Sequence, residues 1–512
     1  MLGSNKLCAV AAASDARSLS RQLSAALRQT RSVELRLDWL SSDREIARFL
    51  RHLAAHRPRA LLIATCRRVQ AGGRYRGTVA KQLLHLAEAI RAGCAWYDLE
   101  IETIRQCPAE LLDVLLGEGR RLASAHFFRG LPENLSQVAA ELERSRPDAI
   151  KIAAQCDSLG EARKLLRFAK QRKSIVAVPM GDVALPARLL SVRMGSAFTY
   201  APVEEATAPG QVSLEQMKML YRGGEFSRRT RVYGVIGDPV MHSLSPQIQN
   251  AAFQARRMDA VHLPFLVQDL RDFVTSLEAF SVRGFSVTLP HKQAILRYLD
   301  ECDPLAARIG AVNTVAVRAG GKLHGYDTDY LGVLRSLEPR ISLRGSRVLI
   351  LGAGGAARAA SFALAQAGAA VYICARRPAR ARALARDVGS QAILWSRVRH
   401  ESFDVIVNAT PVGMHPHAEN SPLAAEELNC RLVFDTIYRP RTTRLLQMAA
   451  RRGIQTVSGV EMFVAQGAAQ FKIWTGQSAP AGVMHRVLEL ALAREEKKEG
   501  MPAPQRKARS RR

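Results

Sequence analysis

Residues 347–368 read RVLILGAGGAARAASFALAQAG, and this stretch decides the fold of the chain around it. An apolar run leads into a glycine-rich turn, and an alanine-rich helical run follows. The turn fits the pattern G-x-G-x-x-A through Gly352, Ala353, Gly354, Gly355, Ala356 and Ala357. Binding of a pyrophosphate at a helix N-terminus requires this order of strand, turn and helix. The stretch predicts a dinucleotide-binding Rossmann unit; a merely tight strand–helix turn is the alternative.

The next apolar run ends in Cys374-Ala375-Arg376-Arg377, and Arg380 follows. A site for NAD usually carries Asp or Glu here to bind the ribose hydroxyls. Cationic side chains instead suit a 2′-phosphate. We therefore expect NADP, bound in part by Arg376, Arg377 and Arg380; a solvated basic start of a helix is the alternative.

Strand-like and helical runs also alternate upstream and downstream of this unit. The strands expected in residues 232–335 are VYGVIGD, VHLPFLV, GFSVTLP and GAVNTVAV, and VYICARR, DVIVNAT and LVFDTIY follow later. The pattern predicts an α/β catalytic domain over 231–335 and a Rossmann domain over 336–495, whose last helices return to the catalytic domain. Residues 496–512 hold a run of Arg and Lys and are expected to form a basic disordered tail.

The first part of the chain has a separate alternation of strand-like and helical runs, which ends at a Gly- and Arg-rich linker near 221–231. Its strand candidates are KLCAVAAA, SVELRLDW, ALLIATCR, AWYDLEI, RLASAHFF, AIKIAAQC, SIVAVPM and SAFTYAPV, with amphipathic runs between them. Such a set of units predicts a closed (β/α)8 barrel over residues 1–222. An open doubly wound sheet is the alternative.

Polar residues stand in or at the ends of these otherwise apolar strands: Glu34, Arg36, Arg67, His126 and Lys151. A lone buried Lys or His usually has a structural partner. In a barrel, however, the carboxyl ends of the strands face the active site. Several polar residues from different strands therefore predict a catalytic pocket.

Composition excludes several classes of protein. The chain has 512 residues, 47% apolar and 23% charged, which is typical of a multidomain globular protein. We expect no membrane-spanning helix, and we interpret the N-terminal apolar run as a strand rather than a signal peptide. The eight cysteines are scattered, which predicts a reducing, cytoplasmic location and no metal site. The net charge of +28 lacks a nucleic-acid-binding motif, so no specific nucleic-acid partner is expected.

The second half closely resembles shikimate dehydrogenase over nearly its whole length. The motifs that carry the resemblance are YGVIGDPVMHSLSP, GFSVTLPHK, IGAVNTV, YDTD, GAGGAAR, NATPVGM, DTIY and EMFVAQGAAQF. The resemblance implies a catalytic pair, Lys292 and Asp329. It implies substrate contacts from Ser243, Ser245, Thr288, Asn313, Tyr438 and Gln466. The expected cofactor site is completed by Asn408, Thr410 and Gly459.

The first half resembles type I 3-dehydroquinate dehydratase through VELRLD, ATCR with Gly72-Gly73, SAH, DAIKIA and TAPGQ. The resemblance implies that Lys151 forms an imine with the substrate ketone and that His126 is the general acid and base. It implies that Arg188 binds the substrate carboxylate and that Glu34, Arg36 and Arg67 bind its hydroxyls. Thr207 and Gln211 are expected on a loop that closes over the substrate.

The chain departs from the family patterns at four positions. Ala71 stands where the dehydratases usually have a Glu that orients the histidine, and Glu100 is a candidate replacement. Thr207 replaces a common Ser, and Phe127 a common Asp. Asp327 stands where the dehydrogenases usually have Asn, which adds a negative charge near the site.

Together the two resemblances predict a bifunctional enzyme of the shikimate pathway. It would dehydrate 3-dehydroquinate to 3-dehydroshikimate and reduce that product to shikimate with NADPH. One alternative keeps the dehydrogenase and treats the barrel as an inactive scaffold, on the strength of Ala71. Another makes the second half a quinate dehydrogenase, although the two serines at 243 and 245 favour shikimate. Oligomeric state is left open.

Overall fold

The computed structural model describes residues 6–172, 174–204 and 211–498. Within these residues the chain forms one sheet of eight strands and two sheets of six. The chain divides into two compact units. The first contains Met1–Thr230 and Phe265–Phe280, and the second contains Arg231–Pro264 and Ser281–Arg512.

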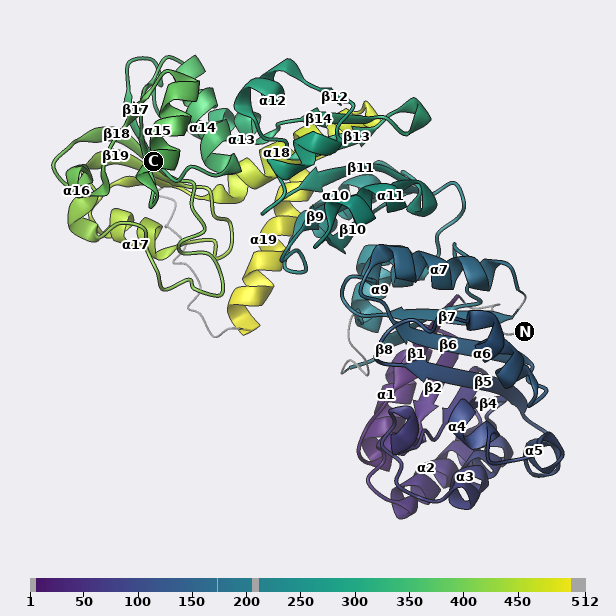
Figure 1. Ribbon diagram of the computed structural model, residues 1–512. Helices are drawn as coiled ribbons and strands as arrows, with labels where there is room; N and C mark the ends of the chain where they lie inside the picture. The colour runs from purple at the N-terminus through teal and green to yellow at the C-terminus, as the bar shows by residue number, and fades with distance from the viewer. Residues whose placement is uncertain (1–5, 173, 205–210, 499–512) are drawn as a thin grey trace. The chain divides into compact units, whose positions relative to one another are not determined.

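The eight-stranded sheet is parallel and lies in the first unit (Figure 1). Its strands pair in the order β7-β6-β5-β4-β3-β2-β1-β8. The backbone N–H of Ala197, just before β8, donates to the carbonyl of Ile175 in β7 at 2.8 Å, so the two ends of the sheet meet. The predicted barrel is thereby confirmed over the open sheet. The strands are β1 (Leu7–Ala11), β2 (Ser32–Arg36), β3 (Leu61–Thr65), β4 (Trp96–Glu100), β5 (Arg120–Phe127), β6 (Ala149–Gln155), β7 (Ile175–Met180) and β8 (Thr199–Pro202).

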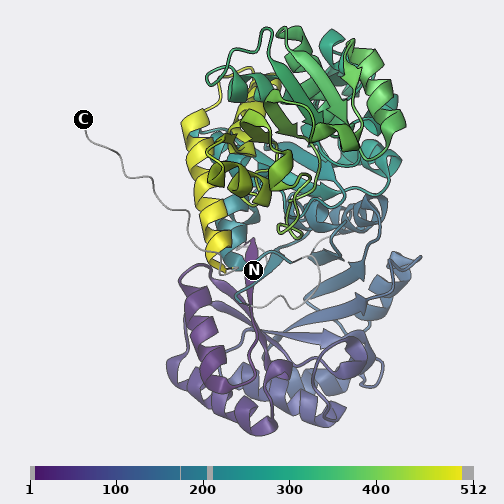
Figure 2. The ribbon, with the colours of Figure 1, turned by 90° about the vertical axis from the view of Figure 1, so that its left-hand side faces the viewer.

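Amphipathic helices surround these strands (Figure 2). Helix α2, for example, starts at Ser42, whose hydroxyl accepts the backbone N–H of Glu45, and it buries Ile46, Phe49, Leu50 and Leu53 at helical spacing. The helices of this region are α1 (Ala16–Leu27), α2 (Asp43–His56), α3 (Val79–Arg91), α4 (Ile101–Ile104), α5 (Ala109–Leu116), α6 (Leu135–Glu143), α7 (Leu159–Lys170), α8 (Leu185–Leu189) and α9 (Leu214–Tyr221).

The strand register sets up a polar layer inside the barrel. Thr65 of β3 pairs with Asp98 of β4. Ser124 of β5 is opposite both Glu100 of β4 and Lys151 of β6. Below this layer, apolar side chains such as Val10, Ile63, Trp96, Leu122 and Val176 form one buried cluster. Since the polar residues lie toward the carboxyl ends of the strands, that end of the barrel holds the candidate site.

The second unit contains the two six-stranded sheets. The order of the first is β10-β9-β11-β13-β14-β12, with β13 antiparallel to its neighbours β11 and β14. It is built from β9 (Arg231–Gly237), β10 (Ala260–Leu266), β11 (Val282–Val287), β12 (Glu301–Cys302), β13 (Thr314–Val317) and β14 (Leu323–Tyr326).

The other sheet of this unit is parallel throughout, in the order β17-β16-β15-β18-β19-β20. This is the predicted Rossmann sheet, and its order reverses at β15, where a dinucleotide site is expected. Its strands are β15 (Arg347–Leu351), β16 (Ala370–Cys374), β17 (Gln391–Ala392), β18 (Phe403–Asn408), β19 (Cys430–Asp435) and β20 (Gln455–Val457).

The last two helices of the described residues pack on earlier helices of this unit: α18 on α13 and α19 on α10. Helix α19 runs to Lys498, so residues 496–498 are helical, which corrects the predicted start of the tail; the rest of the tail lies outside the described residues. The helices of this part of the chain are α10 (Ser245–Ala255), α11 (Leu270–Phe280), α12 (Pro304–Ile309), α13 (Asp329–Leu337), α14 (Gly355–Gln366), α15 (Pro378–Val388), α16 (Trp395–Val398), α17 (Arg444–Arg451), α18 (Gly459–Thr475) and α19 (Ala481–Lys498).

Candidate active sites

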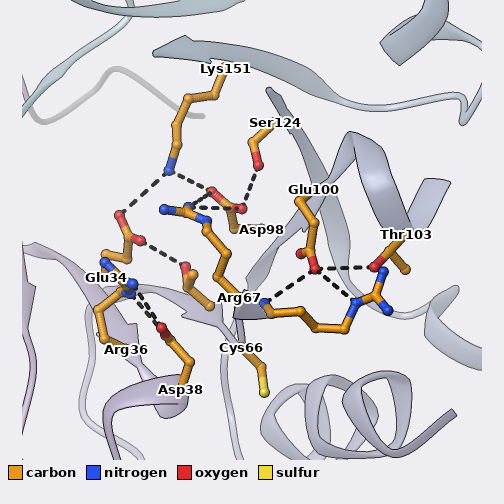
Figure 3. Close-up of polar contacts among 12 residues, drawn as sticks. Glu34, Arg36, Asp38, Cys66, Arg67, Asp98, Glu100, Thr103, Ser124 and Lys151 are labelled. Atoms are coloured by element: carbon orange, nitrogen blue, oxygen red, sulfur yellow. Dashed lines mark hydrogen bonds and ion pairs between the residues drawn. The ribbon is translucent and has the colours of Figure 1, made fainter. Parts of the chain in front are cut away.

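Lys151 extends from its strand toward the carboxylates of Glu34 and Asp98 (Figure 3). Its side chain is 4% exposed, and its Nζ donates to Asp98 Oδ2 at 2.5 Å. Glu34 Oε2 is 3.8 Å from the same nitrogen, and the hydroxyl of Tyr200 is 3.3 Å from it. A buried amine with a pocket around it is the arrangement that imine chemistry requires.

The carboxylate of Asp98 accepts hydrogen bonds from three side chains. Besides Lys151, Ser124 Oγ donates to Oδ1 at 2.7 Å, and Arg67 Nη2 is 3.3 Å from both carboxylate oxygens. Burial alone would raise the pKa of Asp98, but Lys151 and Arg67 outweigh burial and hold the pKa well below its usual range. Asp98 is therefore ionised at neutral pH.

His126 supplies a neutral ring at the same end of the barrel. Burial, and after it the positive charges of Arg67 and Lys151, hold the pKa of His126 well below its usual value. Its Nδ1 is buried and has no hydrogen-bond partner among the described residues. A neutral imidazole is able to accept a proton, as a general base must.

The remaining expected contacts of this pocket are also buried. Arg36 donates to both carboxylate oxygens of Asp38, at 2.9 and 2.8 Å, and Glu34 accepts a hydrogen bond from Thr65 Oγ1 at 2.8 Å. Arg188, on α8, is 4% exposed, and burial lowers its pKa to about 10. Its Nη1 has no partner in the described part of the chain, which suits binding of a carboxylate.

Glu100, the candidate replacement for an acid at position 71, is engaged elsewhere. It accepts hydrogen bonds from Gln82 Nε2 at 2.7 and 2.8 Å and from Thr103 Oγ1 at 3.1 Å, and it is ion-paired with Arg68. No contact between Glu100 and His126 is recorded within the described ranges, and Asp98 is the acid whose charge acts on His126. Ala71 is buried, and the ring of Phe128 covers the neighbouring Gly72.

The expected closing loop is only partly visible. Gln211 is the first residue of the described segment 211–498, and it interacts with another residue of the chain. Thr207 lies outside the described residues. Phe127, at the end of β5, is half-buried.

The second candidate site has Lys292 and Asp329 at its centre. Lys292 Nζ donates to Asp329 Oδ2 at 2.5 Å, and Asn313 Nδ2 donates to Asp329 Oδ1 at 2.8 Å. Burial would lower the pKa of Lys292, but the charge and hydrogen bond of Asp329 outweigh burial and raise it. The amine therefore carries a proton that it can donate to a developing alkoxide.

Asp327 is a second carboxyl close to this pair. It is 8% exposed, its Oδ1 accepts the backbone N–H of Tyr330 at 3.1 Å, and its Oδ2 is buried without a partner in the described residues. Burial, followed by the negative charge of Asp329, raises its pKa to about 7. The predicted extra negative charge is thus largely suppressed below neutral pH.

The other expected substrate contacts lie on several elements of the second unit. Ser243 Oγ accepts the backbone N–H of Ser245 at 3.2 Å, and the hydroxyl of Tyr438 is hydrogen-bonded with Ser243. Thr288 directly follows β11 and stands four residues before Lys292. Gln466 is on α18, where it is 8% exposed and donates to the carbonyl of Phe463 at 3.0 Å. The ring of Phe463 in turn lies 4.1 Å from that of Tyr438.

The glycine-rich turn is shaped to receive a dinucleotide. Gly352 has φ +119°, and a Cβ there would be 2.9 Å from the carbonyl oxygen of Ala409. Gly354 has open space around it, and α14 starts at Gly355 without a side-chain cap, so its N–H groups are available to a pyrophosphate. A Cβ on Gly355 would be 2.9 Å from the side chain of Lys292, which places the lysine directly beside this turn.

The residues expected to bind the rest of the cofactor lie at the carboxyl edge of the same sheet. Arg376, Arg377 and Arg380 are exposed after β16. Asn408 ends β18 and accepts from the hydroxyl of Thr410 at 2.7 Å. Gly459 starts α18, and a Cβ there would be 2.3 Å from the carbonyl oxygen of Thr436. An open helix N-terminus and exposed guanidinium groups fit NADP.

Most of the chain matches known proteins of one pathway. Its residues 7–224 match the family model of type I 3-dehydroquinase, 235–315 that of the shikimate dehydrogenase substrate binding domain, and 459–489 that of the shikimate 5′-dehydrogenase C-terminal domain. A bifunctional 3-dehydroquinate dehydratase/shikimate dehydrogenase of Arabidopsis thaliana, chloroplastic in that plant, is 32% identical over 480 residues, 89% of this chain and 79% of the relative. The chain belongs to the bifunctional 3-dehydroquinate dehydratase/shikimate dehydrogenase family.

Two further similarities concern the second half of this family member. The NADP(+)-dependent shikimate dehydrogenase of Methanothermobacter thermautotrophicus is 43% identical over 282 residues, 52% of this chain and 99% of the relative. A crystal structure of a shikimate dehydrogenase in complex with NADP+ aligns with a TM-score of 0.50 at 37% identity, over 52% of this chain and 97% of that chain. The expected pairing of a lyase with an NADP-dependent oxidoreductase is confirmed.

Three further observations concern metal sites, membrane spans and cysteines in the bifunctional chain. In residues 6–172, 174–204 and 211–498, no group of three or more His, Cys, Asp or Glu side chains is placed to hold a metal. No helix of the described part is long and apolar enough to cross a membrane. All eight cysteines are free.

Sequence reasoning missed several members of the two sites. Asp98, Ser124 and Tyr200 all contact the Lys151 cluster, yet none was expected there. One signal was available: in the strand Trp96–Glu100, an acid stands at a position that alternation places inside the barrel. In the cofactor domain, Asp435 was missed although it accepts from Asn408 Nδ2 at 3.1 Å and from Thr443 Oγ1 at 2.6 Å.

Proposed function

We propose that the chain catalyses both reactions with the residues of these two sites: Lys151 and His126 dehydrate 3-dehydroquinate, and Lys292 and Asp329 reduce the resulting 3-dehydroshikimate. The observation that carries the proposal is the buried amine of Lys151, held among carboxylates beside a neutral histidine. Because the product of the first reaction is the substrate of the second, the order of domains matches the order of the chemistry.

In the barrel, His126 takes a proton from the Lys151 ammonium, and the free amine attacks the ketone carbon. His126 returns the proton to the hydroxyl of this adduct, which leaves as water, and a protonated imine forms. The cationic nitrogen withdraws electrons and acidifies the adjacent C–H. His126, neutral because burial and nearby cations lower its pKa, removes that proton, and the hydroxyl one carbon further on leaves as water. Arg188 binds the substrate carboxylate, while Glu34, Arg36 and Arg67 bind hydroxyl groups. Hydrolysis of the imine then releases the product and the free lysine.

In the second unit, Ser243 and Ser245 bind the substrate carboxylate, and Thr288, Asn313, Tyr438 and Gln466 contact the ring. NADPH, when bound at the turn Gly352–Gly355 with its 2′-phosphate near Arg376 and Arg377, supplies hydride to the ketone carbon. Lys292 donates a proton to the oxygen that becomes the new hydroxyl. Asp329 fixes the amine through the 2.5 Å hydrogen bond and is itself held by Asn313.

The two small-molecule sites account for the proposed function of the chain, so we propose no nucleic-acid or membrane partner. We assign it to the cytoplasm, because eight free cysteines fit a reducing compartment. We propose these domain limits: a barrel up to residue 222, a catalytic domain over 231–335 and a Rossmann domain from 336 to the end of α19.

Reductive trapping tests the role of Lys151. Sodium borohydride, added during turnover of 3-dehydroquinate, reduces the imine and fixes the ligand on the lysine that formed it. Mass spectrometry of peptides should find the adduct on Lys151, and Lys151→Ala should abolish both the adduct and dehydration. Lys170→Ala, which removes an exposed lysine of α7, is the control and should behave as the unaltered chain. An adduct on another lysine, or none, would overturn the assignment.

Lys292→Ala tests the second site. Loss of a positioned acid typically costs on the order of 10²- to 10⁴-fold in rate. The variant should lose that much kcat for shikimate oxidation while it still dehydrates 3-dehydroquinate. Equal kcat in variant and unaltered chain would show that another group donates the proton.

A further inference from the structure

We propose that Asp98 is the positioning residue of the dehydratase: it is the permanent counter-ion of Lys151 Nζ, first of the ammonium and then of the protonated imine. This inference rests on the proposed role of Lys151 in imine formation. Nothing in the sequence motifs assigns a role to Asp98, which is two residues before the engaged Glu100.

The contact geometry singles out Asp98 among the acids near the lysine. Its Oδ2 is 2.5 Å from Lys151 Nζ, while the nearest oxygen of Glu34 is 3.8 Å away. Both side chains of the Lys151–Asp98 pair are screened from solvent, at 4% and 0% exposure. Attraction between charges grows as the distance falls, and solvent screens a buried pair little. Asp98 is therefore the dominant negative charge at the reacting nitrogen.

The carboxylate of Asp98 is fixed in place by its other donors. Ser124 lies on β5, between Asp98 of β4 and Lys151 of β6, and its hydroxyl bonds Oδ1 at 2.7 Å. Arg67 bonds both oxygens from the loop after β3, as Figure 3 shows. These contacts do not involve Nζ, so they keep Oδ2 aimed at the nitrogen after the lysine has reacted.

The charge balance explains why a fixed counter-ion suits this reaction. Overall, the lysine ammonium and the ketone give a protonated imine and one water, so the nitrogen carries one positive charge before and after. An isolated buried cation costs much more free energy than one with a hydrogen-bonded counter-ion. A carboxylate that stays ionised and in place stabilises the imine cation without any rearrangement.

A proton-transfer role for Asp98 fits the electrostatics less well. The cations Lys151 and Arg67 hold its pKa well below its usual range, so it is a poor proton acceptor. Burial and the nearby cations lower the pKa of His126, so its ring is neutral and can accept a proton. Asp98 consequently acts through the lysine and not on the substrate.

The test uses Asp98→Asn in the full-length chain. The amide keeps the shape of the side chain but removes its charge. We expect kcat for dehydration to fall about 100-fold or more, on the scale of a lost buried ion pair, with a much smaller change in KM. Imine trapped by borohydride at saturating 3-dehydroquinate should fall in parallel. Shikimate dehydrogenase activity of the same chain should not change and reports on the integrity of the second unit.

Two further variants separate this role from a purely structural one. Asp98→Glu restores the charge and should recover imine trapping above the level of Asp98→Asn. Asp113→Asn removes another carboxylate of this unit, one that pairs with Arg121 and Arg146, and should leave dehydration unchanged. Melting curves show whether each variant barrel folds; if Asp98→Asn does not, the comparison of Asp98→Glu with the unaltered chain decides.

The inference is overturned if Asp98→Asn, in a folded barrel, forms the imine and turns over as the unaltered chain does. It is also overturned if trapping by the folded Asp98→Glu variant is no better than that by Asp98→Asn. Failure of the unaltered chain to give an adduct on Lys151 would instead refute the proposed function, so the two failures are distinguishable.

Discussion

Asp327→Asn should make the second unit more stable at alkaline pH. Burial and Asp329 raise the pKa of Asp327 from 3.8 in the ordinary carboxyl to about 7 in the fold. The folded chain thus holds this proton more tightly than the unfolded chain, and stability is lost as pH rises from about 4 through 7. A difference of about three pKa units corresponds to about 4 kcal/mol, at roughly 1.36 kcal/mol per unit. Asn does not ionise and avoids that loss.

The assay is thermal unfolding of both chains between about pH 4 and pH 8, with the transition of the second unit identified by its stabilisation by NADPH. The two chains should differ little at the acid end, and the Asn variant should melt several degrees higher above pH 7. Glu338→Gln, at an exposed acid just after α13, is the control and should leave the profile unchanged. The reasoning is refuted if the advantage of Asn is independent of pH or grows as pH falls.

Three other predictions follow from the sites. The double variant Arg376→Ala, Arg377→Ala should raise KM for NADPH about tenfold or more while changing KM for NADH little, since a charge-assisted hydrogen bond contributes roughly 1.5–3 kcal/mol; equal effects on both cofactors would contradict the 2′-phosphate assignment. Arg188→Ala should raise KM for 3-dehydroquinate by about the same factor, measured by the ultraviolet absorbance of the product, and an unchanged KM would place the substrate carboxylate elsewhere. Gly355→Ala should lower dehydrogenase kcat about tenfold or more, because the new Cβ lies 2.9 Å from the side chain of Lys292; full activity would show that the lysine moves aside freely.

The architecture was predictable from local signals. The turn Gly352–Gly355 stands between an apolar strand and a helical run, and in the fold it joins β15 to α14 as expected. Eight apolar runs separated by amphipathic ones indicated the barrel, and each became a strand. Hydrophobic periodicity is a local property, which is why the sequence reveals it. The roles of Lys292 and Asp329 were instead implied by the family resemblance. The structure adds the 2.5 Å hydrogen bond from Lys292 Nζ to Asp329 Oδ2.

The partners of Lys151 were not predictable in the same way. Asp98 is 53 residues away in the sequence, and only the register of β4, β5 and β6 brings the two together. Glu100 was the candidate replacement for the acid that is missing at position 71. In the fold it meets Gln82 of α3 instead, a side chain whose reach depends on how the helix packs. Such pairings depend on tertiary geometry that no motif encodes.

The coupled reaction tests the central claim most directly. The purified chain is mixed with 3-dehydroquinate and NADPH, and the absorbance of the reduced nicotinamide is followed. We predict that NADPH is oxidised with 3-dehydroquinate as the only carbon substrate, because both halves act in series on the same chain. Oxidation with 3-dehydroshikimate but not with 3-dehydroquinate would contradict the account of the barrel, and no oxidation with either would contradict the account of the second site.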